Sequence, residues 1–205
     1  MNDANKSSPK RESSGDVPAL VAEHLALDLL NTVPKVNGEL VDALQDDDDV
    51  LRWLATAGLP LAGRLKLEPL ELLRAARRLR AVIRSAVEAA AAGEAVDGRA
   101  LNRFLAKAES RVRLAAGPGR SLRVERYWGG QSAEQMLGPI AEAAGELLAT
   151  RDFNLIRQCE DETCVLWFYD HTKAHRRRWC SMATCGNRNK VAAFRERQQQ
   201  HGVER

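Results

Sequence analysis

The residues most able to do chemistry are four cysteines in the last quarter of the chain. They form two Cys-x4-Cys pairs separated by fifteen residues: Cys159 with Cys164, and Cys180 with Cys185. Four thiolates complete a tetrahedral shell around Zn²⁺ and leave no position open, which is typical of a structural rather than a catalytic site. The spacing therefore predicts one structural zinc ion per chain.

The alternative is two disulfide bonds. No apolar signal segment follows Met1, so nothing directs the chain to an oxidising compartment. Paired cysteines in a cytosolic protein favour a metal over disulfides. No apolar run approaches the roughly 20 residues that cross a bilayer. We therefore expect a soluble, cytoplasmic protein without a membrane partner.

The charge of the chain is distributed unevenly. Its formal net charge is +3, yet the segment 171–197 holds eight cations and a single anion, which leaves the rest of the chain mildly acidic. The cations are Lys173, Arg176, Arg177, Arg178, Arg188, Lys190, Arg195 and Arg197. Such asymmetry indicates that this segment meets a polyanionic partner.

The pattern along the chain predicts three parts. Residues 1–17 have too few apolar residues to offset the entropy of ordering, which predicts a disordered tail. Residues 18–152 are expected to form a helical domain. Its longest helix has an apolar face from Leu72 to Ala90, and a β-hairpin is expected near 111–126. Residues 153–200 are expected to form the zinc finger.

Two segments of the helical part carry signals for helix starts. The run Asp46 to Asp49 precedes an apolar helical pattern, so we expect these carboxylates to cap a helix rather than to bind cations. Ser132 and Gln135 have the spacing of a capping box, which predicts a further helix that runs to about Thr150.

Within the finger, aromatic and β-branched residues predict a strand over 165–169 and a returning strand over 176–179. A helix whose first turn carries the last ligand, Cys185, is expected to lead into a polar helical run to Gln200. A knuckle, a hairpin and a helix that starts at the last ligand are the layout of a treble clef. The predicted fold class is mainly α with a small β-hairpin, in which a helical N-terminal domain precedes a treble-clef-like zinc finger with four cysteine ligands.

Two motifs resemble a known family. The string from Arg178 to Lys190, which contains Cys-Gly-Asn-Arg at 185–188, resembles the signature of the CGNR zinc-finger family of bacterial proteins. The string Leu25 to Thr32 resembles the start of the helical domain that precedes the finger in that family. The resemblance implies a stress-linked transcription regulator that binds DNA.

The basic residues near the finger agree with double-stranded DNA as a partner. We expect Arg176, Arg177, Arg178, Arg188 and Lys190 to hold phosphates, and Asn187 to read adenine if the helix start enters the major groove. The alternative is that Asn187 shapes the turn after the last ligand while Arg188 pairs with a local carboxylate. A protein-interaction zinc module attached to a helical ligand-binding domain is the alternative function.

In the first helix His24, Asp28 and Asn31 lie at positions i, i+4 and i+7, on one face amid leucines. Either they satisfy one another and the backbone, or they line a pocket for a small-molecule effector. No nucleophile with its base and no glycine-rich cofactor loop is visible, so we expect no enzyme.

A single finger offers a small footprint on DNA, and regulators commonly extend it by two-fold symmetry. We therefore expect a homodimer, formed through the helix over 72–90 or its neighbours.

Overall fold

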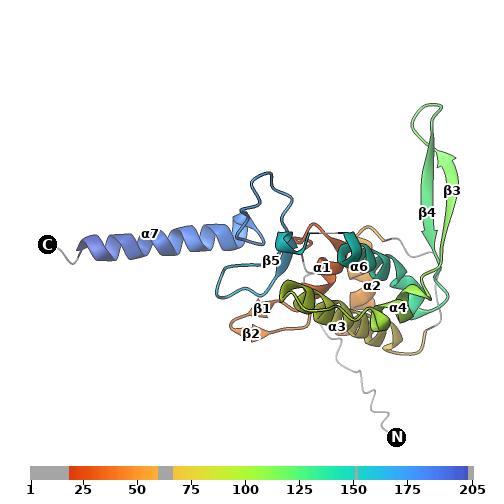
Figure 1. The fold of residues 1–205 in the computed structure, drawn as a ribbon, viewed down its shortest axis with the longest axis horizontal. Helices are drawn as coiled ribbons and strands as arrows, with labels where there is room; N and C mark the ends of the chain where they lie inside the picture. The colour runs from red at the N-terminus through yellow and green to blue at the C-terminus, as the bar shows by residue number, and fades with distance from the viewer. Residues whose placement is uncertain (1–18, 60–66, 151, 203–205) are drawn as a thin grey trace, which may run out of the picture.

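The structure is a computed structural model, and it describes residues 19–59, 67–150 and 152–202. The tail expected over 1–17 lies outside these residues. The fold is mainly α with small two-stranded sheets, as the sequence predicts, and Figure 1 shows two elements, α7 and the β3–β4 hairpin, projecting from a helical body.

The described helices are α1 (Leu25–Leu30), α2 (Asp47–Thr56), α3 (Glu71–Ala91), α4 (Arg99–Leu105), α5 (Ala133–Met136), α6 (Gly138–Thr150) and α7 (Asn187–Gly202), with a 3₁₀ turn η1 (Phe153–Leu155) and a π-type turn η2 (Met182–Gly186). The strands are β1 (Lys35–Val36), β2 (Glu39–Leu40), β3 (Ser110–Ala116), β4 (Leu122–Trp128), β5 (Ile156–Gln158) and β6 (Trp167–Tyr169). They pair antiparallel as β1–β2, β3–β4 and β5–β6.

Helix α3 lies at the centre of the body. Its predicted apolar face is buried, and Leu72, Leu79 and Ile83 have no exposed surface. This face therefore forms the core of the chain itself, so it does not supply the dimer interface that the sequence suggested for it.

The acidic run caps helices, as predicted. The Asp46 carboxylate accepts the backbone N–H of Asp49 at 2.8 Å at the start of α2. The Asp47 carboxylate reaches the start of α3, where it accepts the N–H groups of Leu70 and Leu73, each at 2.8 Å. One short run of carboxylates thus supplies partners for unpaired N–H groups at two helix starts.

The segment from Ser132 to Thr150 differs from its prediction. The expected cap is present, because the Ser132 hydroxyl accepts the N–H of Gln135 at 3.2 Å. The single expected helix is divided at Leu137 into α5 and α6. Pro139, two residues after Leu137, has no N–H to continue the hydrogen-bond ladder of α5, which accounts for the interruption.

The helical body and the finger share one hydrophobic core. Ile156, Trp167 and Tyr169, from the sheet that begins the finger, belong to the same buried cluster as the leucines of α1 and α3. A second, small cluster holds the four cysteines and Phe168. The sheet β5–β6 therefore joins the two parts as well as leading into the metal site.

Candidate metal centre and nucleic-acid interface

The structure brings the four cysteine sulfurs together. All four Sγ atoms lie within 4.8 Å of one another, with 3.8 Å between Cys164 and Cys180 and 3.6 Å between Cys180 and Cys185. A tetrahedral zinc with Zn–S bonds of about 2.3 Å places its sulfurs about 3.8 Å apart. The separations fit a shared metal ion and exceed the S–S bond of about 2.05 Å that a disulfide requires. The four cysteines are therefore positioned to hold one structural zinc ion.

The pKa values of the cysteines indicate that the four sulfurs can all lose their protons only when a cation is bound between them. The pKa of Cys164 is lowered to about 5 because its sulfur accepts a hydrogen bond from Cys180. Burial raises the pKa of Cys185 to about 11, and the bond to Cys164 raises that of Cys180. Without a cation the cluster retains protons, and zinc binding must release them.

A buried carboxylate joins the first cysteine knuckle to the start of α7. Asp161 is 4 % exposed and accepts from Arg188 Nε at 2.8 Å and from Asn189 Nδ2 at 2.6 Å. Although burial acts to raise it, the pKa of Asp161 is lowered to about 2 by the hydrogen bonds from Arg188 and Thr163. Arg188 also donates from Nη2 to the sulfur of Cys185 at 3.2 Å. This clasp fixes α7 against the metal site.

Arg177 is a structural residue of the finger. Its guanidinium donates to the carbonyls of Val21 and Cys180, at 3.0 and 2.6 Å, and to the Glu23 carboxylate at 2.6 Å. It also stacks on Phe168, with 4.4 Å from Cζ to the ring centre. Arg177 therefore ties the finger to the segment that precedes α1.

The loop before Arg177 differs from the predicted hairpin. Strand β6 pairs with β5 instead of with residues 176–179. Asp170 is fully buried and accepts from the N–H and hydroxyl of Thr172, at 3.0 and 2.6 Å, and from the N–H of Arg177 at 2.9 Å. These bonds hold residues 170–177 in a loop.

The remaining predicted DNA contacts lie on the surface of the finger. Arg176, Arg178 and Lys190 are exposed, and Arg178 pairs with Glu160 at 2.5 Å while lying over the ring of Trp179. Asn187 is exposed, and its side chain donates to the carbonyl of Ala183 at 3.2 Å. An open hollow of about 360 Å³ lies between Arg178 and Lys190.

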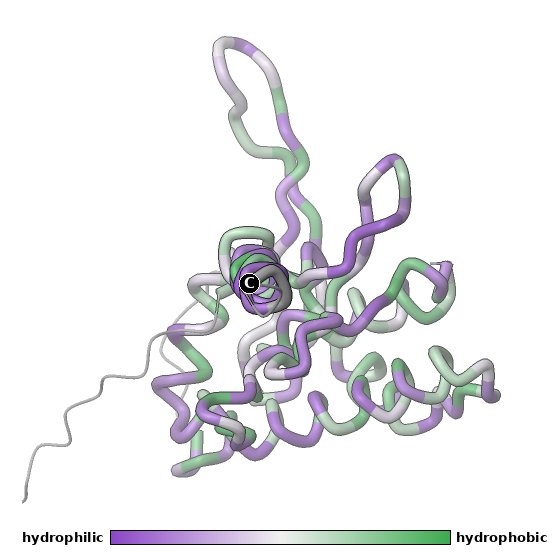
Figure 2. The backbone as a smooth tube through the Cα atoms, turned by 90° about the vertical axis from the view of Figure 1, so that its left-hand side faces the viewer, coloured by the Kyte–Doolittle hydropathy of each residue, from purple (hydrophilic) through white to green (hydrophobic). Residues whose placement is uncertain are grey.

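Helix α7 projects from the finger into solvent. Figure 1 shows it leaving the molecule, and Figure 2 views it end-on, largely hydrophilic around its circumference. Its 16 residues correspond to about 24 Å of helix. Val191 and Phe194 are 47 % and 56 % exposed. Most of its residues whose burial the structure describes are exposed, so α7 packs little against the rest of the protein.

The three residues proposed for an effector pocket have partners inside the protein. His24 caps α1, and its Nδ1 accepts the N–H of Ala26 at 3.3 Å. The Asp28 carboxylate accepts the N–H of Ala22 at 2.9 Å. The side-chain amide of Asn31 forms two hydrogen bonds with the finger, donating to the carbonyl of Trp167 and accepting its N–H, each at 2.8 Å. A ligand at these residues stays a prediction.

Asp28 is expected to make stability depend on pH. Burial raises its pKa to about 6 from the ordinary value of 3.8, so the folded state binds this proton more tightly than the unfolded state. The protonated Asp28 carboxyl therefore adds to the free energy of unfolding. This addition is complete below about pH 4 and is lost as the pH rises through about 6. Asp28→Asn keeps an acceptor for the N–H of Ala22 but cannot titrate. As the pH rises from about 5 to about 7.5, the free energy of unfolding of this variant should therefore increase by about 1 kcal/mol relative to that of the wild type. Urea unfolding with zinc in excess measures this gain, and a difference that does not change with pH would refute it.

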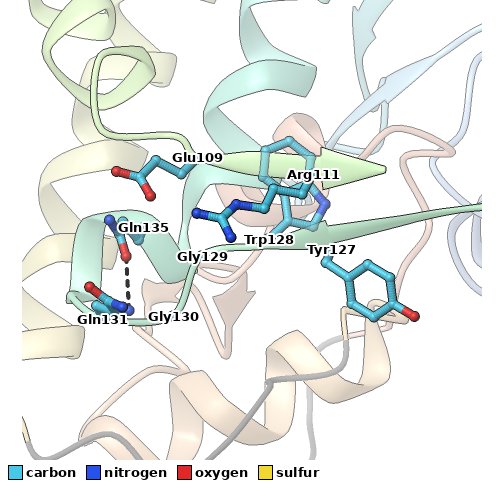
Figure 3. Close-up of a pocket in the computed structure, with 8 residues that line it drawn as sticks. All are labelled: Glu109, Arg111, Tyr127, Trp128, Gly129, Gly130, Gln131 and Gln135. Atoms are coloured by element: carbon cyan, nitrogen blue, oxygen red, sulfur yellow. Dashed lines mark hydrogen bonds between the residues drawn. The ribbon is translucent and has the colours of Figure 1, made fainter. Parts of the chain in front are cut away.

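A cavity that the sequence did not suggest lies at the base of the β3–β4 hairpin. It measures about 210 Å³ and is lined by Glu109, Arg111, Tyr127, Trp128, Gly129, Gly130, Gln131 and Gln135. Figure 3 shows the Arg111 guanidinium directed among these residues, beside the Trp128 ring. The cavity is separate from the finger and from the His24 group.

Asp161, Asp170 and the Asn31 contact were not predicted as parts of the finger. The one signal for Asp161 in the sequence was an acidic residue inside the Cys-x4-Cys knuckle, and this signal is weak because acidic residues are common in turns.

None of the helices in the described part of the chain has the length and apolar character needed to span a membrane.

Comparison with known proteins identifies both parts of the chain. Residues 23–151 match the ABATE family, described as "Putative stress-induced transcription regulator", and residues 156–198 match the CGNR zinc finger. A comparison with curated proteins found no match. Neither matched family describes an enzyme. Because the first match covers more than half of the sequence, the chain belongs to the ABATE family and carries a CGNR zinc finger.

Proposed function

We propose that the chain is a transcription regulator that binds double-stranded DNA through the finger and α7. The observation that carries the proposal is α7 itself, a projecting helix with four cations and one anion between Asn187 and Gly202. The major groove of B-DNA admits an α-helix, and cations along such a helix reach the phosphates on either side.

The basic and polar residues of the finger have three different roles in this proposal: phosphate contact, positioning and base contact. Arg176, Arg178 and Lys190 are the phosphate contacts that we propose, since their side chains are exposed around the start of α7. Arg177 and Arg188 act as positioning residues. Arg177 is half-buried and bonded within the finger, and Arg188, although its side chain is 55 % exposed, is held by the buried Asp161 carboxylate. Asn187 is at the first turn of α7, where the proposal has it approach the base edges.

The salt dependence of binding tests this function. Affinity for duplex DNA should fall steeply with salt, and Arg176→Ala or Lys190→Ala should each reduce the slope of log K against log salt by about one. Arg103→Ala, at an exposed cation on α4, is the matched control and should leave the slope unchanged. Fluorescence anisotropy with labelled duplexes measures the slopes.

The competing function is a module that binds an acidic protein. It would be favoured by DNA binding that does not respond to salt, or by the failure of any genomic fragment to be retained. Selection of bound fragments from genomic DNA would identify the target sequence if the DNA proposal holds.

A further inference from the structure

The β3–β4 hairpin has an apolar face that no described residue covers. Val112, Leu114, Leu122 and Val124 are 62, 66, 67 and 69 % exposed. The register places Leu114 opposite Val124, so these side chains lie on the same face. Figure 1 shows the hairpin standing clear of the helices, and Figure 2 confirms this from a second direction.

The opposite face of the hairpin is polar and internally bonded. Glu125 accepts hydrogen bonds from Arg113 at 3.0 Å, from Arg123 at 2.5 Å and from the Tyr127 hydroxyl at 2.6 Å. Arg113 also lies over the Tyr127 ring at 4.1 Å. The polar side chains of this face thus already have partners within the hairpin. The apolar face is the one that lacks packing contacts.

Two physical arguments indicate that the apolar face is occupied in the working protein. A two-stranded hairpin without packing is marginally stable at best in water. Four large aliphatic side chains, each about two-thirds exposed, also form a patch of a few hundred Å², which a monomer rarely leaves open unless it is a binding site.

We propose that two copies of the chain associate through this face, hairpin against hairpin about a two-fold axis. A two-fold contact uses the same patch on both partners, and an aliphatic patch is complementary to itself. None of the four residues toward the turn that share this face, Leu114, Ala116, Leu122 and Val124, is charged, so a charged partner would gain nothing from them. The cation at the base of the face, Arg126 opposite Val112, already has partners in the protein: it donates to the Ser110 hydroxyl at 2.9 Å and lies 3.8 Å from the Glu142 carboxylate. Residues 1–17 offer only Met1 and Val17 as large apolar residues and cannot supply a matching cover.

The size of the contact sets the expected strength. Two such faces bury on the order of 1,000 Å² together, which is near the lower limit for a specific interface. We therefore expect a dimer that forms at micromolar concentrations. The hairpin and α7 project from opposite ends of the body in Figure 1, so this contact leaves both fingers accessible.

Analytical ultracentrifugation of the full zinc-loaded chain tests the proposal. The wild type should be dimeric at tens of micromolar, and Leu114→Glu should raise the dissociation constant at least tenfold. Ala115→Glu is the matched control, because it adds the same charge one residue away on the opposite face, across from Arg123. It should leave the dissociation constant within about twofold of the wild type.

A double variant, Leu114→Thr with Val124→Thr, guards against loss of the hairpin itself. Threonine retains β propensity while removing apolar surface, so the variant should weaken the dimer with an unchanged circular dichroism spectrum. A monomeric wild type, a dimer that resists both face variants, or equal loss with Ala115→Glu would each overturn the proposal. It does not rest on DNA binding: a monomeric variant should still bind a single half-site if the finger binds DNA.

Discussion

Removal of zinc from the full chain is expected to unfold the finger beyond β6 and to lower the melting temperature of the helical body. The cluster around the cysteines has one fully buried large side chain, Phe168, so little apolar burial remains to hold it without the metal. Structural zinc supplies about 10–16 kcal/mol in small fingers of this kind. The body is affected too, because Trp167 and Tyr169 belong to its core.

Three measurements check this result. Metal analysis should find about one zinc per chain, and a chelator should change the fluorescence of Trp167 and Trp179 while most helical circular dichroism remains. Cys159→Ser should reproduce the effect, and Ser181→Ala, beside the third ligand, should not. A metal-free chain with an intact finger, or a disulfide between Cys159 and Cys164, would contradict the assignment.

Asn31→Ala is expected to destabilise the protein by about 2–5 kcal/mol. Asn31 is 2 % exposed, and its amide is the partner of both the N–H and the carbonyl of Trp167. Alanine would leave two backbone groups buried without a partner, at the place where the finger meets the body. The loss should therefore exceed that of an ordinary hydrogen bond.

Urea unfolding of the zinc-loaded chain measures this loss. Asn102→Ala, at an exposed asparagine of α4, is the control and should change stability by less than about 0.5 kcal/mol. Zinc content should stay at about one per chain, because Asn31 does not touch the ligands. A loss as small as that of the control would show that the contact with Trp167 is not needed for docking.

The metal site could be predicted because a zinc site is defined by ligand type and spacing, both of which are local in the sequence. The apolar period of α3 and the alternation of β3–β4 are likewise local, and the structure bears them out. The family resemblance was visible in Cys185 to Arg188 and is confirmed by the matches.

The rest depended on contacts that the sequence pattern does not show. Strand β6 pairs with β5, while the hydrogen bonds that Asp170 accepts from Thr172 and Arg177 hold residues 170–177 in a loop where a returning strand was expected. Three consecutive arginines looked equivalent in the sequence, yet Arg177 is bonded inside the finger while Arg176 and Arg178 face solvent. The spacing of Asp28 and Asn31 predicted a shared face, but nothing local showed that Asn31 would meet the finger.

The direct passage from the last cysteine into α7 has a mechanical consequence. Only Gly186 separates Cys185 from the first residue of α7, and the Asp161 clasp leaves no hinge between them. The helix thus extends about 24 Å from the metal site with no hinge at its base. A tilt of the finger by about 10° would carry the tip of α7 through about 4 Å relative to the start of the helix. Small repacking where the finger meets the body would thus be magnified into a larger displacement of the tip of α7.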